Sequence, residues 1–301
     1  MSTSFGEEAK RMFKEGSILI RLILINGAVF LAVNVFSLIL KLMNSPGDDF
    51  LIEWLSSTSN LGDLLFKPWS IITYMFLHED IMHIFWNMLI LFFVGNIFLQ
   101  FLGSKRLLST YFLGGISGLL LYIISYNVFP IFWPYRADSI ILGASASVMG
   151  IFIAAATYRP NHPVKLIFIG SVKFKYIAMF YVLLDIISIR NGENSGGHIA
   201  HLGGAIFGYV YGRQLINGRD LSINFYRLLN GITAAFRPKK KVHMEYRRPG
   251  RPVSDDDFNK RKKNEQDRID IILDKISKSG YDSLSKEEKA FLFKTSNGNK
   301  Q

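Results

Sequence analysis

Residues 197–216 read GHIAHLGGAIFGYVYGRQLI, an apolar stretch in which glycine recurs every four residues at Gly204, Gly208 and Gly212. About 20 mostly apolar residues suffice for a helix to cross a bilayer. Small residues four apart share one helix face and let a neighbouring membrane helix approach closely. The stretch therefore predicts a membrane-spanning helix that packs tightly along its glycine face.

A matching face is present upstream, in residues 140–158, a short stretch rich in alanine, serine and glycine. Small residues repeat there at the same spacing, at Ala146, Gly150 and Ala154. Docking the two faces would bring Ser145, near the start of the upstream stretch, to a depth similar to that of His201. We therefore expect these two helices to be neighbours.

Four more apolar stretches complete a bundle. They span residues 18–42, 81–102, 107–128 and 176–189. The six stretches predict an all-α membrane protein, with a membrane domain of six transmembrane helices over residues 18–216. Residues 1–17 are charged and lack a signal-peptide cleavage pattern, so we expect a cytoplasmic N-terminal segment and a retained first helix.

The composition agrees with this class of protein. The chain of 301 residues is 49% hydrophobic, with a net charge of +11, and charged residues become dense after Arg237. This distribution favours a membrane domain followed by a basic soluble tail. The chain has no cysteine, which excludes disulfides, thiolate nucleophiles and zinc sites built from cysteine.

The basic residues of the short loops predict the orientation in the membrane. They gather before the first helix and after the second, fourth and sixth helices, at Lys10, Arg11, Lys14, Lys105, Arg106, Arg159, Lys165, Lys173, Lys175, Arg213 and Arg219. Lys and Arg concentrate on the cytoplasmic side of membrane proteins. We expect both termini in the cytoplasm. The long loop at about residues 44–80 then faces outward, either as an ordered surface loop or as a segment in the headgroup region.

Ser145 lies in the sequence Gly143-Ala144-Ser145-Ala146-Ser147, near the start of its helix. A serine in a membrane helix is usually a packing residue or bonds to the preceding turn. A helix start, however, offers free N–H groups and a positive dipole end, which would stabilise an oxyanion. His201 is the candidate base for this serine, because it heads the glycine face. His198, one turn earlier, is the weaker candidate.

His83 and Asn87 lie four residues apart at the start of the second helix, so both side chains share one face. Both can donate hydrogen bonds to an oxyanion; the alternatives are a metal site or a polar lock between helices. That helix face carries no acid, so we expect neither a zinc site nor another cofactor. His78, five residues earlier, is expected to organise the end of the loop by hydrogen bonding.

Asp185 is the acid that lies inside a predicted span. Ionisable residues in a membrane interior are costly and are functional candidates for that reason. We interpret Asp185 as a lock between helices, and the third member of a catalytic triad is the alternative.

Three motifs together resemble the signatures of rhomboid intramembrane serine proteases, and each lies on the expected helix. They are Gly143-x-Ser145, His83-x-x-x-Asn87 and His201-x-x-Gly204-x-x-x-Gly208. Pro68-Trp69 is similar to the Trp-Arg loop motif of that family. The resemblance covers about residues 18–216 and implies a six-helix rhomboid-like bundle.

The resemblance also implies a mechanism. It implies a Ser145–His201 dyad without a third acid, and an oxyanion hole made by the Ser145 amide with His83 and Asn87. It implies transmembrane protein substrates, cleaved near the outer membrane boundary, and a location in the bacterial inner membrane. We expect His78 and Gly143 to line the same water-filled cavity.

Several residues depart from the family pattern. Ser70 stands where the loop arginine is expected, Ala146 replaces a common glycine, and Met149 occupies a position that often holds an aromatic residue. Leu99-Gln100-Phe101 lacks the acidic-x-arginine pair common at the end of the second helix. None of these changes removes a reacting group.

The tail has two parts. Residues 217–264 form a basic linker, with Lys239-Lys240-Lys241 and Arg247-Arg248, which predicts contact with anionic lipids. No sequence signature of a nucleic-acid-binding fold accompanies these charges, so no nucleic acid is expected. Residues 265–301 predict a small helical hairpin, an interaction or stability module whose partner the sequence does not identify. Its second helix begins at Ser285 with a capping-box pattern.

Two other functions compete with the protease. A catalytically inactive rhomboid-like protein would bind membrane clients, but such proteins typically lack the serine or the histidine. A small transporter would favour internal repeats and broken helices, and no convincing repeat is present. The sequence therefore favours an intramembrane serine endopeptidase.

Overall fold

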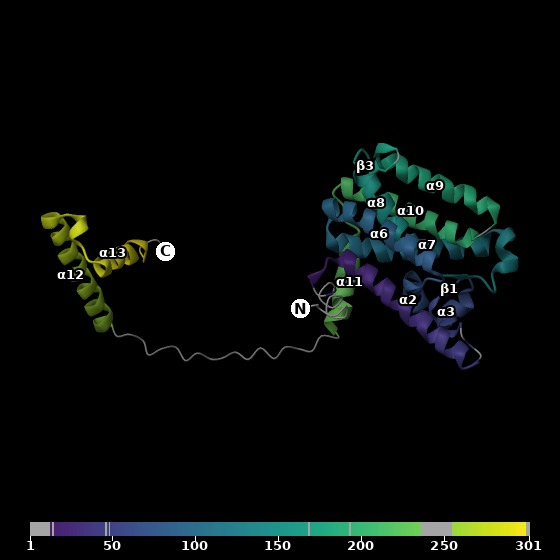
Figure 1. Ribbon diagram of the computed structural model, residues 1–301, viewed down its shortest axis with the longest axis horizontal. Helices are drawn as coiled ribbons and strands as arrows, with labels where there is room; N and C mark the ends of the chain where they lie inside the picture. Colours follow the sequence, from purple (N-terminus) through teal and green to yellow (C-terminus); the bar gives the residue numbers. More distant parts are fainter. Residues whose placement is uncertain are drawn as a thin grey trace. The chain divides into compact units, whose positions relative to one another are not determined.

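The computed structural model of the chain describes residues 13, 15–45, 47, 49–167, 169–192, 194–235 and 255–298. The chain divides into two compact units, Met1–Arg237 and Pro238–Gln301. The first unit is helical, and its helices form the bundle shown in Figure 1.

Six long helices of the first unit correspond to the six predicted stretches. They are α2 (Ile18–Leu42), α6 (Ile81–Leu102), α7 (Ser104–Val128), α8 (Ser145–Tyr158), α9 (Phe174–Asn191) and α10 (Ser195–Ile216). Among the described residues, α2, α6 and α7 are long and apolar enough to cross a membrane, and α8 is a shorter apolar helix. The all-α membrane fold is thus confirmed, whereas the count of six spans stays a prediction.

The helix predicted over residues 140–158 begins later than expected. Ile140–Ile141 form a strand, β2, which pairs antiparallel with β1 (Ser57–Thr58) from the long loop. Gly143 follows with a φ of +120°, a conformation that side chains other than glycine rarely adopt. This backbone cannot continue a helix, so α8 begins at Ser145.

The long loop after α2 is ordered. It contains α3 (Phe50–Leu55), α4 (Leu61–Phe66), α5 (Ser70–Thr73) and the 3-10 turn η1 (Tyr74–Phe76). The rings of Trp54 and Trp69 stack with centroids 5.3 Å apart, and Trp69 Nε1 donates to the Trp54 carbonyl at 2.8 Å. Pro68-Trp69 therefore braces this loop internally. Ser70, in the place of the expected arginine, is buried.

The remaining elements of the first unit come after α7 in the chain. They are η2 (Pro130–Tyr135), the hairpin β3 (Pro163–Leu166) with β4 (Gly170–Lys173), and α11 (Ser222–Ala235). Residues 217–264 were expected to form a linker, but α11 lies within them. Arg106 Nε donates to Asp220 Oδ2 at 2.7 Å, and Asp220 Oδ1 accepts from the Ser222 amide and hydroxyl. These bonds connect the start of α11 to α7.

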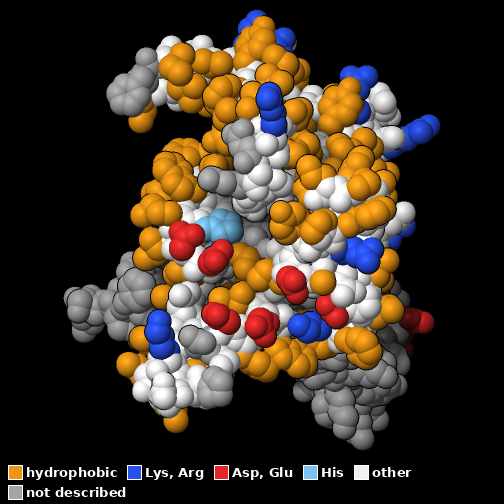
Figure 2. Space-filling view, turned by 90° about the vertical axis from the view of Figure 1, so that its right-hand side faces the viewer, with side chains coloured by type: hydrophobic (Ala, Val, Ile, Leu, Met, Phe, Trp, Pro, Cys, Tyr) orange, Lys and Arg blue, Asp and Glu red, His pale blue; other side chains and the backbone are white. Residues whose placement is uncertain are grey.

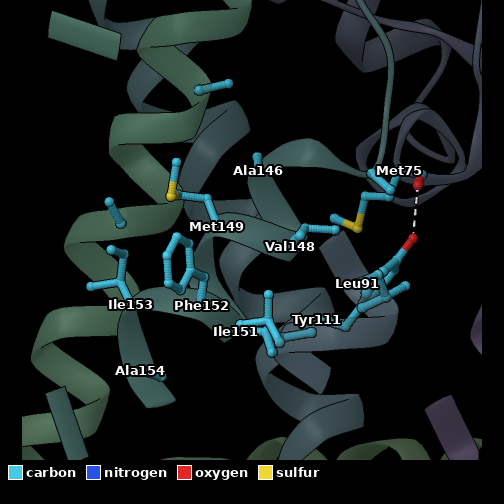
Figure 3. Close-up of a cluster of buried hydrophobic side chains, with 14 of the residues drawn as sticks. Met75, Leu91, Tyr111, Ala146, Val148, Met149, Ile151, Phe152, Ile153 and Ala154 are labelled. Atoms are coloured by element: carbon cyan, nitrogen blue, oxygen red, sulfur yellow. Dashed lines mark hydrogen bonds between the residues drawn. The ribbon is translucent and has the colours of Figure 1, made fainter. Parts of the chain in front are cut away.

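The core of the bundle surrounds α8. Every residue from Ala146 to Ala156 is buried, and the helix packs against α6, α7 and α10. In Figure 3, Val148 and Ile151 point to the side of Tyr111, whereas Phe152 and Ile153 point the opposite way. The Tyr111 hydroxyl donates to the Met75 carbonyl at 2.8 Å, which connects α7 to the loop (Figure 3).

The small-residue faces of α8 and α10 dock as the sequence predicts. Three glycines of α10 face the backbone of small residues of α8, pairing Gly204 with Ala146, Gly208 with Gly150, and Gly212 with Ala154. A methyl group on Gly208 would lie 2.5 Å from the Gly150 carbonyl oxygen. The absence of side chains is therefore what allows the two backbones to approach.

The second unit contains a helical hairpin made of α12 (Asp255–Ser279), the turn η3 (Tyr281–Ser283) and α13 (Lys286–Gly298). Ile272 and Leu284 are buried in it. The Ser285 amide donates to Glu288 Oε2 at 2.7 Å, and the Glu288 amide donates to Ser285 Oγ at 3.3 Å. This reciprocal pair is the predicted capping box. The lysine and arginine clusters of residues 239–248 lie outside the described residues.

Candidate active site

Ser145 is the first residue of α8, and the turn before it is held by the long loop. The Gly143 amide donates to the Tyr74 carbonyl at 2.9 Å, directly after the short β1–β2 pairing. Ala144, the N-cap residue, has no side chain that could accept a hydrogen bond from the first turn. The amide of Ser145 is therefore one of the N–H groups that a helix leaves for an external acceptor.

His78 lies behind this turn and not in the cavity. Its side chain is 3% exposed, and the Ala144 amide donates to His78 Nε2 at 3.5 Å. The expectation that His78 lines the cavity is therefore wrong, because His78 is buried beside Ala144 and does not belong to the lining of the cavity described below. Burial, aided by the neighbouring His83, lowers the pKa of His78 to about 4. The ring is thus neutral at pH 7 and can accept the Ala144 bond.

His83 and Asn87 belong to the first turns of α6. Asp80 caps this helix, accepting hydrogen bonds from the Met82 and His83 amides at 2.8 and 2.9 Å. These bonds to its charged form hold the pKa of the Asp80 carboxyl below its usual value. Asn87 Nδ2 donates to the His83 carbonyl at 2.9 Å. An amide nitrogen carries two hydrogens, so one N–H remains for another acceptor.

His201 contacts Asp185, the acid that the sequence predicts as a lock between helices or, alternatively, as the third member of a catalytic triad. Its Nδ1 lies 2.8 Å from Asp185 Oδ1, and Nδ1 of His198 lies 2.7 Å from the same oxygen. Asp185 comes from α9 and both histidines come from α10. The acid does connect two helices, as expected of a lock, but the group that it contacts is the candidate base. The spacing of residues along α9 gives no sign of which helix face turns toward α10.

One cavity of about 660 Å³ brings most of the candidate residues together. Its lining includes His83, Asn87, Gly143, Ser145 and His201. Glu79 and Asp80 also belong to the lining. Figure 2 shows a face of the molecule on which acidic side chains gather around a histidine in a hollow, with hydrophobic surface on either side.

A second cavity, of about 300 Å³, lies among α6, α8, α9 and α10. Ser145, Asn87 and His201 contribute to it as well, together with Asp185 and His198. Met149, at the position where an aromatic residue was expected, is also part of its lining. The serine and the histidine therefore line both cavities, and the acid of α9 lines the second.

Within the described residues, Asp185, His198 and His201 also have the spacing of a metal site. One ligand atom from each residue lies within 4.8 Å of the others. Imidazole and carboxylate groups are ligands that Zn²⁺ accepts. In this structure, however, Nδ1 of His198 and Nδ1 of His201 are both within hydrogen-bond distance of the same oxygen of Asp185.

The polar site lies inside a bundle of apolar helices, and this arrangement defines a multi-pass membrane protein. Its serine and histidine resemble the reactive groups of a hydrolase. Residues 66–218 match the Rhomboid domain, about half of the chain. The chain therefore belongs to the rhomboid family, which includes intramembrane proteases. Residues 254–297 match a second family, DUF6576, described as a family of unknown function.

Three curated proteins are similar to the chain. RHOMBOID-like protein 12, mitochondrial, of Arabidopsis thaliana is 28% identical over 50% of this chain and 47% of its own length. Presenilin-associated rhomboid-like protein A, mitochondrial, of Danio rerio is 30% identical over 52% of this chain and 41% of its own length. The chain thus spans less than half the length of these two relatives. Rhomboid protease AarA of Providencia stuartii is 28% identical over 68% of this chain and 75% of its own length.

Proposed function

We propose that the chain is an intramembrane serine endopeptidase that cleaves transmembrane segments of membrane proteins near the outer membrane boundary. Ser145 is the nucleophile and His201 is the general base. The observation that carries this proposal is the glycine contact between α8 and α10, which sets the serine and the histidine beside the same cavity. The likeness to a protein named rhomboid protease supports it.

The reaction runs in two halves. His201 takes the proton of the Ser145 hydroxyl while Oγ attacks the carbonyl carbon of the substrate peptide bond. The tetrahedral intermediate collapses, the C–N bond breaks, and the leaving amine takes the proton from His201. Water from the 660 Å³ cavity then attacks the acyl carbon while His201 takes its proton. The ester bond to Oγ breaks, Oγ takes the proton back from His201, and the acid product leaves.

The negative oxygen of the intermediate needs donors that are already in place. The Ser145 amide, His83 and the second N–H of Asn87 are the groups that we assign to this role. His83 Nε2 supports the assignment by its closeness to the nucleophile turn. An ideal Cβ built on Gly143 would lie 2.8 Å from that nitrogen and 3.7 Å from Ser145 Oγ.

The length of α8 supports cleavage below the outer surface. The helix has 14 residues, so at about 1.5 Å per residue it is roughly 21 Å long. The hydrocarbon core of a bilayer is about 30 Å thick. With its C-terminal end at the cytoplasmic boundary, α8 would begin roughly 9 Å below the outer boundary. A substrate helix must therefore unwind near its outer end to reach Ser145.

The location is proposed from the loop charges. The distribution of Lys and Arg supports cytoplasmic termini, and the likeness to the Providencia stuartii protein supports insertion in a bacterial inner membrane. The basic linker would then face the inner leaflet and bind anionic lipids, without nucleic acid as a partner. Accessibility of single cysteines, introduced at residues 2 and 60, to an impermeant reagent tests the orientation, because the parent chain has none.

The alternative is a rhomboid-like protein that binds membrane clients without cleaving them. The experiment that separates the two is reconstitution in liposomes with a panel of labelled transmembrane substrates. The intact chain is compared with Ser145→Ala and with Ser147→Ala as the matched control. We expect cleavage by the intact chain and by Ser147→Ala only. Equal cleavage by Ser145→Ala would overturn the assignment of the nucleophile.

A further inference from the structure

We propose that Asp185 is a positioning residue for His201, and that His198 holds Asp185 in the required place. This inference rests on the proposed protease function. It replaces a two-residue dyad by a relay of four side chains, His198, Asp185, His201 and Ser145, contributed by three helices.

Asp185 contacts Nδ1, one of the two ring nitrogens of His201. The two nitrogens of an imidazole ring lie on opposite sides, and a neutral ring carries its proton on only one of them. An ionised carboxylate only accepts hydrogen bonds, so the 2.8 Å contact keeps the proton of His201 on Nδ1. Nε2 is then left as the acceptor that a general base needs. The contact thus selects the reactive tautomer.

Asp185 also acts on the charge that His201 carries during the reaction. When His201 takes the proton of Ser145, the ring becomes a cation, and Asp185 lies against it. Asp185 is 6% exposed, and water therefore screens this pair much less than it screens a pair at the surface. A charge of opposite sign at this distance stabilises the cationic ring when it forms, as the acid of a catalytic triad does.

His198 helps to hold the carboxylate of Asp185 in place. The two histidines are three residues apart on α10, so they share a helix face. Their rings meet edge to face with centroids 5.7 Å apart, and both direct Nδ1 to the same oxygen of Asp185. The other carboxylate oxygen is buried and has no hydrogen-bond partner among the described residues. Within that part of the chain, the two histidines therefore fix the carboxylate.

A lock between helices would need only that α9 and α10 be joined. It would not need the acid to meet the ring nitrogen that decides the tautomer of the base. The two roles differ in what they change: a lock changes the stability of the fold, whereas a positioning residue changes the rate of the folded enzyme.

The experiment measures kcat, KM and the midpoint of thermal unfolding for the full-length protein and for Asp185→Asn. Asparagine keeps the size and an acceptor oxygen but removes the charge. We expect kcat to fall about 10²-fold, the range for loss of effective general-base catalysis, with KM changed less than about threefold since no substrate contact is removed. Asp185→Glu, which restores the charge, should recover part of the rate.

Asp220→Asn is the matched control. Asp220 also links helices, through Arg106, Tyr211 and Ser222, but lies outside both cavities described above. We expect this variant to lower the unfolding midpoint and leave kcat unchanged. If Asp185→Asn behaves like Asp220→Asn, Asp185 is a lock and the inference is wrong.

His198→Gln tests whether His198 holds Asp185 in place. The loss of kcat should be smaller than for Asp185→Asn, and the double variant should be no slower than Asp185→Asn, because both residues act through one carboxylate. Independent, multiplying losses would contradict this role. Ser145→Ala separates a failure of the protease proposal from a failure of the proposed role of Asp185. Full activity in it defeats the protease proposal, whereas an inactive Ser145→Ala with a fully active Asp185→Asn defeats only the role of Asp185.

Discussion

Gly143 and His83 approach so closely that a methyl group on the glycine would lie 2.8 Å from His83 Nε2. The contact joins the turn before Ser145 to the first turns of α6. Gly143 also has a positive φ, which glycine adopts readily and other residues rarely adopt. The position of the ring therefore depends on the absence of a side chain at residue 143.

Gly143→Ala should accordingly lose activity without loss of the fold. The new methyl group must displace either His83 or the turn, and a misplacement of about 1 Å can cost about 10²-fold in rate. The measurement is kcat for a labelled substrate, beside circular dichroism of the same preparation. Gly218→Ala, also at positive φ but with no atom from elsewhere in the described chain within 4 Å of the new methyl group, controls for backbone strain. Equal losses in both variants would argue against a role for the His83 contact.

Asn87→Ala should lower kcat by about 10²–10³-fold if Asn87 donates to the oxyanion. Asn96 is the matched control, because its side chain makes the same kind of bond to the carbonyl four residues earlier, at 2.7 Å, but is exposed on α6. Asn96→Ala should leave the rate unchanged. A variant of Asn87 that only lowers the unfolding midpoint would mark the residue as a structural lock.

Stability should fall when the pH is lowered from about 6.5 to about 4, in part because of His78. In the unfolded chain a histidine binds a proton below about pH 6.5, whereas burial lowers the pKa of His78 in the folded chain to about 4. Proton uptake by the unfolded state alone lowers the free energy of unfolding, here on the order of 3 kcal/mol across the window.

Thermal unfolding between pH 4 and pH 8 checks this for the parent chain and for His78→Asn. The asparagine does not titrate, so the dependence in that window should become weaker. Asp80 affects the stability at lower pH than His78 does. Its carboxylate accepts stabilising hydrogen bonds, which are lost only when the pH falls through its lowered pKa. An unchanged pH dependence in His78→Asn would show that His78 is not the titrating group.

Gly208→Ala should separate α8 from α10 and lower both stability and rate. The methyl group would lie 2.5 Å from the Gly150 carbonyl oxygen, and such overpacking typically costs about 1–3 kcal/mol. Gly27→Ala in α2 is the control, since among the described residues no atom outside its own helix backbone and chain neighbours lies within 4 Å of its methyl group. Thermal unfolding and substrate cleavage measure the two effects. Similar behaviour of the two variants would contradict the docking of the helix faces.

A chain that ends at Arg237 should cleave a model substrate in neutral detergent at a near-normal rate, because the candidate reacting groups belong to the first unit. A defect should appear in anionic bilayers, where each Lys or Arg near the surface contributes about 1 kcal/mol of binding. The matched control is the full chain with Lys239, Lys240, Lys241, Arg247 and Arg248 changed to Gln. Loss of activity of the folded, truncated protein in detergent would assign the tail a part in catalysis.

The sequence predicted the features that follow from helical spacing. Glycine every four residues predicted which face of α10 meets α8, because a close approach needs a continuous strip without side chains. The spacing of His83 and Asn87 likewise predicted that both would border one cavity. Each of these inferences uses one helix and a period of about 3.6 residues.

Features that depend on how separate segments meet were not predictable in this way. The pairing of Ser57–Thr58 with Ile140–Ile141 involves two residues on each side, too few for a strand pattern. The contact of Asp185 with His201 depends on the rotation of α9 about its own axis, and the apolar residues around that helix do not indicate it. His78 is buried beside Ala144, a residue far from it in the sequence, whose amide donates to its ring.

The complete enclosure of α8 has a consequence for biosynthesis. A segment of 14 residues is shorter than the roughly 20 that membrane insertion of a single helix requires. Because its neighbours bury it from Ala146 to Ala156, protein and not lipid must provide its surroundings. The ribosome releases α10 only after α8 and α9, so α8 lacks its packing against α10 when it is first made. Ser145, the candidate nucleophile, therefore enters the bilayer on a helix that completes its packing only after α10 has been made.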